Sequence, residues 1–168
     1  LHSIPYAQAL GIPYLSISSG VTELGPEVAH FAHHPRSAPI VLGSEWLVGL
    51  TALTALLYRR EFRALDRIAM TAVLDSEDIG GPAAHADFER LTAAGPLALL
   101  REDGQWRWVS AQDGLGTRQV AGVDGRLMEA QAYSPFDVLS LATATGASSV
   151  RFDLVVGETA SRRRGEPF

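Results

Sequence analysis

The sequence of 168 residues contains neither cysteine nor lysine. Without cysteine there can be no disulfide, no thiolate metal ligand and no thiol nucleophile. All 14 basic side chains are arginines, so no lysine is present to form a Schiff base or to act as a general acid or base. Because a cytoplasmic protein needs no disulfides, the absence of cysteine agrees with the cytoplasmic location that we expect.

Basic charge and long apolar runs are also scarce. The net charge is −5, and no basic stripe is present, so we expect no nucleic-acid partner. No apolar run reaches the roughly eighteen residues that a membrane span needs, and no signal-peptide pattern is present, so we expect no membrane partner. With 46% hydrophobic and 20% charged residues, the composition is that of a globular protein.

The chain is organised around the stretch from Ala38 to Phe62, in which a short apolar run meets Gly43 and a longer, mostly apolar segment follows. Its first part, Pro39 to Leu42, predicts a buried strand that ends at Gly43. Ser44 is a good N-cap for a helix that continues to Phe62 and has leucines along a wide face. We expect this helix to be nearly buried against a neighbouring helix, strand or subunit.

The residues before this stretch have the pattern of an α/β unit. Ile4 to Leu10 predicts a helix ending at Gly11, and the segment 12–18 predicts a strand. A second helix is expected from Thr22, which we take as its N-cap. Ligands bind at the carboxyl ends of parallel strands, which would place three residues on a ligand-facing rim, unless they form only a turn: Ser18, Ser19 and Gly20.

One group of residues on the second helix has the spacing of metal ligands. Glu27, His30 and His34 would share a helix face. No other cluster nearby completes a ligand shell, and histidines in a last turn also suit the helix dipole. We therefore expect no metal site.

The second half predicts an α+β layer with a mixed or antiparallel sheet. Apolar residues alternate from Arg67 to Leu74, as in a strand with one apolar face. Glu102-Asp103-Gly104 and Asp124-Gly125 each separate two apolar runs, which indicates two hairpins. A helix should begin at Ser134-Pro135 and end at Gly146, and a last strand should span 149–156.

These patterns divide the chain into three parts. Residues 1–43 are expected to be the last elements of a parallel α/β sheet, and 44–63 a connecting helix. Residues 64–168 are expected to be an α+β domain. The expected fold is thus the tail of a parallel α/β sheet followed by an α+β domain.

Three segments carry a family resemblance: Gly11–Ser18, Ala38–Gly43 and the loop Asp75–Ala84. Together with the order of the elements, they resemble the saccharopine dehydrogenase-like oxidoreductases. The resemblance covers most of the chain but includes no signature motif. It implies that residues 1–43 are the C-terminal elements of a Rossmann-like domain and that residues 64–168 serve substrate binding or dimerisation. It also implies NAD or NADP as cofactor, a small-molecule substrate and a homodimer.

The glycine-rich fingerprint G-x-G-x-x-G that holds a dinucleotide pyrophosphate is missing. If the resemblance holds, the fingerprint lies before Leu1. The chain is then a C-terminal or middle portion of an oxidoreductase, and alone it should not bind a dinucleotide tightly.

A hydride-transfer enzyme needs a proton donor or acceptor and cationic groups for a carboxylated substrate. The catalytic candidates are Asp78, His85 and Tyr133; alternatively, Asp78 lies in an acidic loop before a helix, His85 faces solvent and Tyr133 packs in the sheet. The expected cofactor-binding residues are Ser18, Ser19, Gly20, Gly43 and Ser44. The expected substrate-binding residues are Glu45, Trp46, Gly80 and Gly81.

A second hypothesis is a non-catalytic domain for dimerisation or small-ligand binding. The missing fingerprint and the missing lysine favour it. A glycosidase function has no support, because the carboxylates are scattered along the sequence and nothing sets the distance between any two of them. A serine hydrolase has none either, because Gly43-Ser44-Glu45 lacks the second glycine of G-x-S-x-G.

Overall fold

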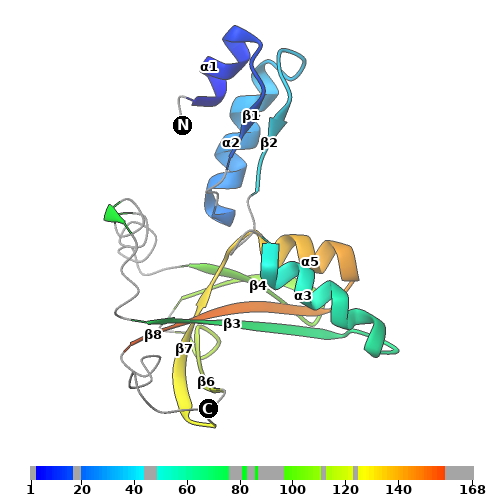
Figure 1. Cartoon of the computed structure of the whole chain (residues 1–168), viewed down its shortest axis with the longest axis vertical. Helices are drawn as coiled ribbons and strands as arrows, with labels where there is room; N and C mark the ends of the chain where they lie inside the picture. Colours follow the sequence, from blue (N-terminus) through cyan, green and yellow to red (C-terminus); the bar gives the residue numbers. More distant parts are fainter. Residues whose placement is uncertain are drawn as a thin grey trace, which may run out of the picture. The chain divides into compact units, whose positions relative to one another are not determined.

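The chain alternates between two structural units in this computed structural model (Figure 1). The first unit comprises Leu1–Leu65 and Ser134–Gly146, and the second comprises Asp66–Tyr133 and Ala147–Phe168. The structure describes residues 3–16, 20–43, 49–75, 81–82, 86, 97–110, 113–122 and 125–157. The domain boundaries expected from the sequence stay a prediction.

A parallel β-α-β crossover lies in the first unit. Helix α1 (Ser3–Leu10) precedes β1 (Tyr14–Leu15), and α2 (Val21–His33) connects β1 to β2 (Ile40–Val41). The strands pair in parallel, with Tyr14 opposite Ile40 and Leu15 opposite Val41. A small parallel sheet is therefore present, with strands of only two residues each, and its expected place at the end of a Rossmann-like domain stays a prediction.

The side chain of Gln8 joins α1 to the end of α2. Its Nε2 donates hydrogen bonds to the carbonyl oxygens of Phe31 (3.0 Å) and His34 (2.9 Å). These carbonyls lie at the C-terminal end of α2, where they also accept from the N–H groups of His34 and Ser37. Gln8 is buried together with Ile4 and Ala7 of the same helix. The contact fixes α1 against the C-terminal end of α2.

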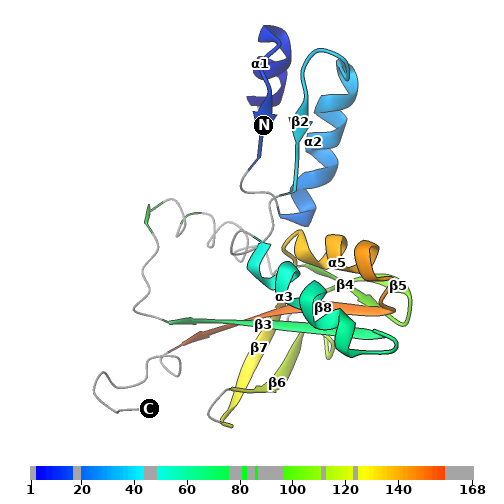
Figure 2. The same cartoon turned by 45° about the vertical axis from the view of Figure 1, so that its right-hand side comes forward.

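Two further helices of the first unit, α3 (Leu50–Tyr58) and α5 (Asp137–Thr145), lie side by side (Figure 2). A short 3₁₀ turn, η2 (Arg59–Glu61), continues α3. Gly49 is the N-cap, and the expected cap Ser44 lies outside the described residues. The expectation that this helix is nearly buried is wrong. Of α3, only Ala52 is buried, while Leu50, Leu53 and Leu57 are 60–68% exposed.

A curled, mixed sheet forms the second unit. Its strands are β3 (Arg67–Asp75), β4 (Ala98–Glu102), β5 (Gln105–Val109), β6 (Thr117–Ala121), β7 (Leu127–Tyr133) and β8 (Ser149–Gly157). The order is β5-β4-β8-β7-β6, and β3 pairs with β8 in parallel. All other pairs in this sheet are antiparallel. The α+β layer with a mixed sheet is thus confirmed.

Both predicted hairpins are present. Glu102 pairs with Gln105, so Asp103-Gly104 is a two-residue turn, with φ of 48° and 80°. Positive φ at both positions is typical of the type I′ turn that Asp-Gly favours. In the second hairpin β6 and β7 pair from Thr117–Gln131 to Ala121–Leu127.

Strand β8 occupies the centre of the sheet. One of its edges pairs with β3 over nine residues. The other edge meets β4 at Val150 and β7 from Phe152 to Leu154, so two strands share it. Sharing one edge lets the sheet curl, and Figure 1 shows β6 and β7 turning away from β3 and β8. Within the described residues, no helix has the length and apolar character to span a membrane.

Candidate functional site

The candidate site lies where the two parallel strands of the first unit end. Ser16 directly follows β1, and Leu42-Gly43 follows β2. Because the strands are parallel, these carboxyl ends lie at the same edge of the sheet. In α/β proteins this edge is where ligands bind.

The segment Ser134–Phe136, far away in the sequence, lies against these strand ends. The backbone N–H of Val21 donates to the carbonyl oxygen of Ser134 (3.4 Å), and Gly20 forms a β-bridge with Pro135. The ring of Phe136 covers Gly43. The structure therefore brings Gly20 and Gly43, two expected cofactor-binding residues, to one short segment.

The close approach of the Phe136 ring requires a glycine at position 43. The φ of Gly43 is +79°, which is unfavourable for residues with a side chain. A Cβ added there would lie 2.6 Å from the Cε2 atom of Phe136. Both the backbone conformation and the contact with the ring exclude a side chain without rearrangement.

A buried polar pair lies beside the same strand end. The hydroxyl of Ser16 donates to the Oε1 atom of Glu27 on α2 at 3.4 Å, and both side chains are buried. The sequence has no signal for this pair, because its spacing relates Glu27 only to His30 and His34. Among the described residues no three His, Cys, Asp or Glu side chains form a group that could hold a metal ion.

The N-terminus of α2 carries its own anionic cap. The carboxylate of Glu23 accepts a hydrogen bond from the N–H of Gly20 (3.4 Å), and the N–H of Glu23 donates to the carbonyl of Gly20 (2.9 Å). Gly20, and not Thr22 as expected, is therefore the N-cap. A carboxylate at this helix end repels a phosphate. Gly20 is thus poorly placed to hold a pyrophosphate.

Of the remaining predicted residues, Tyr133 and Gly81 belong to the second unit, and the others lie outside the residues that the structure describes. Tyr133 is half-buried, and its ring centroid lies 6.3 Å from that of Phe152. Gly81 is exposed. Eight predicted site residues lie outside the described part of the chain: Ser18, Ser19, Ser44, Glu45, Trp46, Asp78, Gly80 and His85.

The geometry of the site suits ligand binding at a strand edge. It offers backbone at Gly20 and Gly43, an aromatic ring at Phe136 and a buried carboxylate at Glu27. Backbone and an aromatic ring can hold a planar or sugar-like group, whereas the acidic helix cap disfavours a phosphate. Comparison with models of known protein families and with curated proteins finds no match for this chain.

Proposed function

We propose that this chain is a C-terminal portion of an NAD(P)-dependent oxidoreductase that resembles the saccharopine dehydrogenases. The observation that carries the proposal is the parallel β1-α2-β2 crossover, whose carboxyl ends meet the Ser134–Phe136 segment. Dinucleotide cofactors bind at such strand ends. In this proposal the first unit completes the cofactor sheet, and the second unit supplies substrate and dimer contacts.

The exposed apolar residues of the small sheet support this proposal. Leu15 and Val41 lie opposite each other in β1 and β2, and both are more than half exposed. Parallel sheets are normally covered on both faces, and two short strands alone are marginally stable. Additional strands and helices of a cofactor domain would cover these residues.

The anionic cap of α2 agrees with a pyrophosphate site elsewhere. A dinucleotide needs a glycine-rich turn and a free helix N-terminus, and Glu23 occupies this one. In the proposal the fingerprint lies upstream of Leu1, and Gly20 and Gly43 contact the nucleoside part of NAD or NADP. Proton transfer is assigned to Asp78, His85 or Tyr133, and substrate contacts to Glu45, Trp46, Gly80 and Gly81.

The test compares the complete gene product with residues 1–168 alone. We expect the complete protein to bind NADH or NADPH in a fluorescence titration, and the shorter chain not to bind. In the complete protein, Gly43→Ala should weaken binding at least tenfold, because its Cβ displaces Phe136 at the strand edge. Gly146→Ala is the matched control, since Gly146 also has positive φ but no neighbour near an added Cβ. The proposal fails if the complete protein binds neither dinucleotide.

The exposed face of α3 favours a second candidate function, dimerisation without catalysis. Leu50, Leu53 and Leu57 have the i, i+3, i+7 spacing of one helix face. A contiguous exposed apolar face on a helix is typical of an interface. A second copy of the chain would bury it, and sedimentation of the chain tests this.

A further inference from the structure

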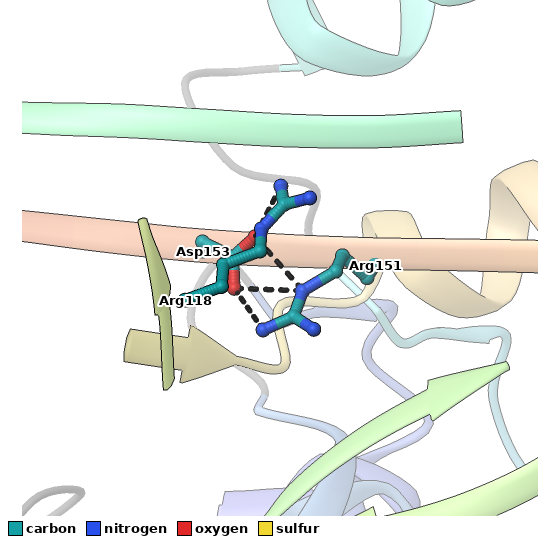
Figure 3. A network of polar contacts seen from close by, with 3 residues as sticks. All are labelled: Arg118, Arg151 and Asp153. Carbon is teal, nitrogen blue, oxygen red and sulfur yellow. Dashed lines mark hydrogen bonds and ion pairs between the residues drawn. The ribbon is translucent and has the colours of Figure 1, made fainter. Parts of the chain in front are cut away.

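The second unit contains a buried carboxylate held by two arginines (Figure 3). Asp153 on β8 has a side chain that is 0% exposed. Arg151 donates from Nη2 to Oδ1 (2.6 Å) and from Nε to both carboxylate oxygens (2.9 Å each). Arg118 donates to Oδ2 from Nε (2.8 Å) and Nη2 (2.6 Å). Both guanidinium groups are therefore held in fixed orientations.

Two alanines on β7 make this arrangement possible. Strand β7 separates β6 from β8, and Arg118 on β6 pairs with Ala130 while Ala132 pairs with Asp153. Paired residues share a face of the sheet. Arg118 must therefore reach Asp153 across the strand where only small, buried side chains lie.

The cluster has more positive charge than its carboxylate neutralises. Two guanidinium groups contact one carboxylate, and among the described residues neither arginine has another ion-pair partner. One arginine would be enough to compensate Asp153. A buried ion pair is costly to desolvate, so a second cation is an inefficient means of stabilising the fold.

The guanidinium groups are also accessible. The side chains of Arg118 and Arg151 are 32% and 18% exposed. The contacts with Asp153 use Nε and Nη2 of each arginine, so within the described part of the chain each Nη1 is left for another acceptor. Arginine forks suit carboxylate and phosphate oxygens because two parallel N–H groups match their geometry.

Strand β3 pairs with β8 and has exposed residues beside the cluster. Its register places Ala69 opposite Arg151 and Thr71 opposite Asp153, so both lie on the face of the sheet that carries the arginines. Both are exposed and have small side chains. The hydroxyl of Thr71 is thus a further donor beside the excess positive charge.

We propose that Arg118, Arg151 and Thr71 form a binding site for one oxyanion, a carboxylate or phosphate group of a small molecule. Asp153 is the positioning residue that holds both guanidinium groups before the ligand arrives. Such preorganisation lowers the entropy cost of binding. The site does not depend on the oxidoreductase proposal, since it rests on contacts within the second unit.

The test is a calorimetric titration of the chain with sodium phosphate and with sodium acetate at constant ionic strength maintained with sodium chloride. We expect saturable binding of at least one of them. Arg118→Gln should weaken it about tenfold or more, because it removes charge-assisted hydrogen bonds. Asp153 keeps its contact with Arg151 in this variant. The control is Arg107→Gln, which removes an exposed arginine on β5 and should leave binding unchanged.

Thr71→Val provides a second variant that should fold normally, because Thr71 is exposed and valine favours strands. We expect a several-fold weaker affinity from the loss of one donor. Tighter binding of acetate than of phosphate identifies a carboxylated ligand, and the reverse order identifies a phosphorylated one. The proposal is overturned if neither anion binds saturably, or if Arg118→Gln and Thr71→Val both bind like the unaltered chain.

Discussion

Gly43 is the residue whose replacement should most directly disturb the strand edge. Alanine at φ +79° costs about 1–2 kcal/mol of backbone energy. Displacing the ring of Phe136 adds about 1–3 kcal/mol, as overpacking does in other cores. We therefore expect Gly43→Ala to lower the free energy of unfolding by about 2–5 kcal/mol in urea denaturation.

A substitution at Gly146 distinguishes the backbone cost of alanine from the cost of displacing Phe136. Gly146 has a similar φ of 73° at the end of α5, and an added Cβ would meet nothing within 4 Å. Gly146→Ala should therefore cost only the backbone term, about 1–2 kcal/mol. Equal losses for the two variants would show that the Phe136 contact adds nothing at Gly43.

Thr51 is a second residue whose replacement should change the free energy of unfolding, because its side chain joins α3 to α5. Its hydroxyl donates to Asp137, whose carboxylate is fully buried. Thr51→Val keeps the shape and removes the donor, which should destabilise the protein by about 1–3 kcal/mol in urea denaturation. In the control, Thr54→Val, the exposed hydroxyl donates to the carbonyl of Leu50 in its own helix, so we expect a change within about 0.5 kcal/mol. A similar loss in both would contradict a special role for Thr51.

The exposed face of α3 leads to a prediction at the scale of one element. Leu53→Gln should change the free energy of unfolding by no more than about 0.5 kcal/mol, because Leu53 is exposed. If this face joins two copies, the substitution should raise the dimer dissociation constant about tenfold or more in sedimentation equilibrium. Leu127, an equally exposed leucine on β7, is the control position. Unaltered self-association of Leu53→Gln would exclude this face.

Elements that depend on local sequence were predictable. Asp103-Gly104 sets its own turn through positive φ, and Gly146 ends α5 in the same way. The exposure of α3 was not predictable, because its leucine pattern says which residues share a face but not what covers it. The central position of β8 was not predictable either, since it depends on parallel pairing with β3, about eighty residues earlier.

The candidate site was predictable only in part. The pattern of strand and helix predicted both Gly20 and Gly43 near strand ends. In the structure Gly43 follows β2, whereas Gly20 is the N-cap of α2. The contact of both glycines with Ser134–Phe136 joins segments about a hundred residues apart, for which the sequence has no local signal. Arg118 and Arg151 were likewise missed, because their shared partner Asp153 is defined by strand order.

At the scale of the whole molecule, the two sheets should differ strongly in local stability. Strand β8 is hydrogen-bonded on both edges, and Val150, Phe152 and Asp153 are almost completely buried. The strands β1 and β2 contain two residues each, with Leu15 and Val41 exposed.

Amide hydrogen exchange should measure this difference directly. Local opening free energies range from near zero for short, exposed elements to the global value for central strands. We expect the amides of β8 to exchange at least a hundredfold more slowly than that of Ser16, which donates to Val41 in the small sheet. If the proposed cofactor domain adds strands over β1 and β2, Ser16 should exchange more slowly in the complete gene product, while β8 changes little. Equal protection of Ser16 in both forms would show that no added element covers the small sheet, which would remove the support that the exposed Leu15 and Val41 give to the proposed cofactor domain.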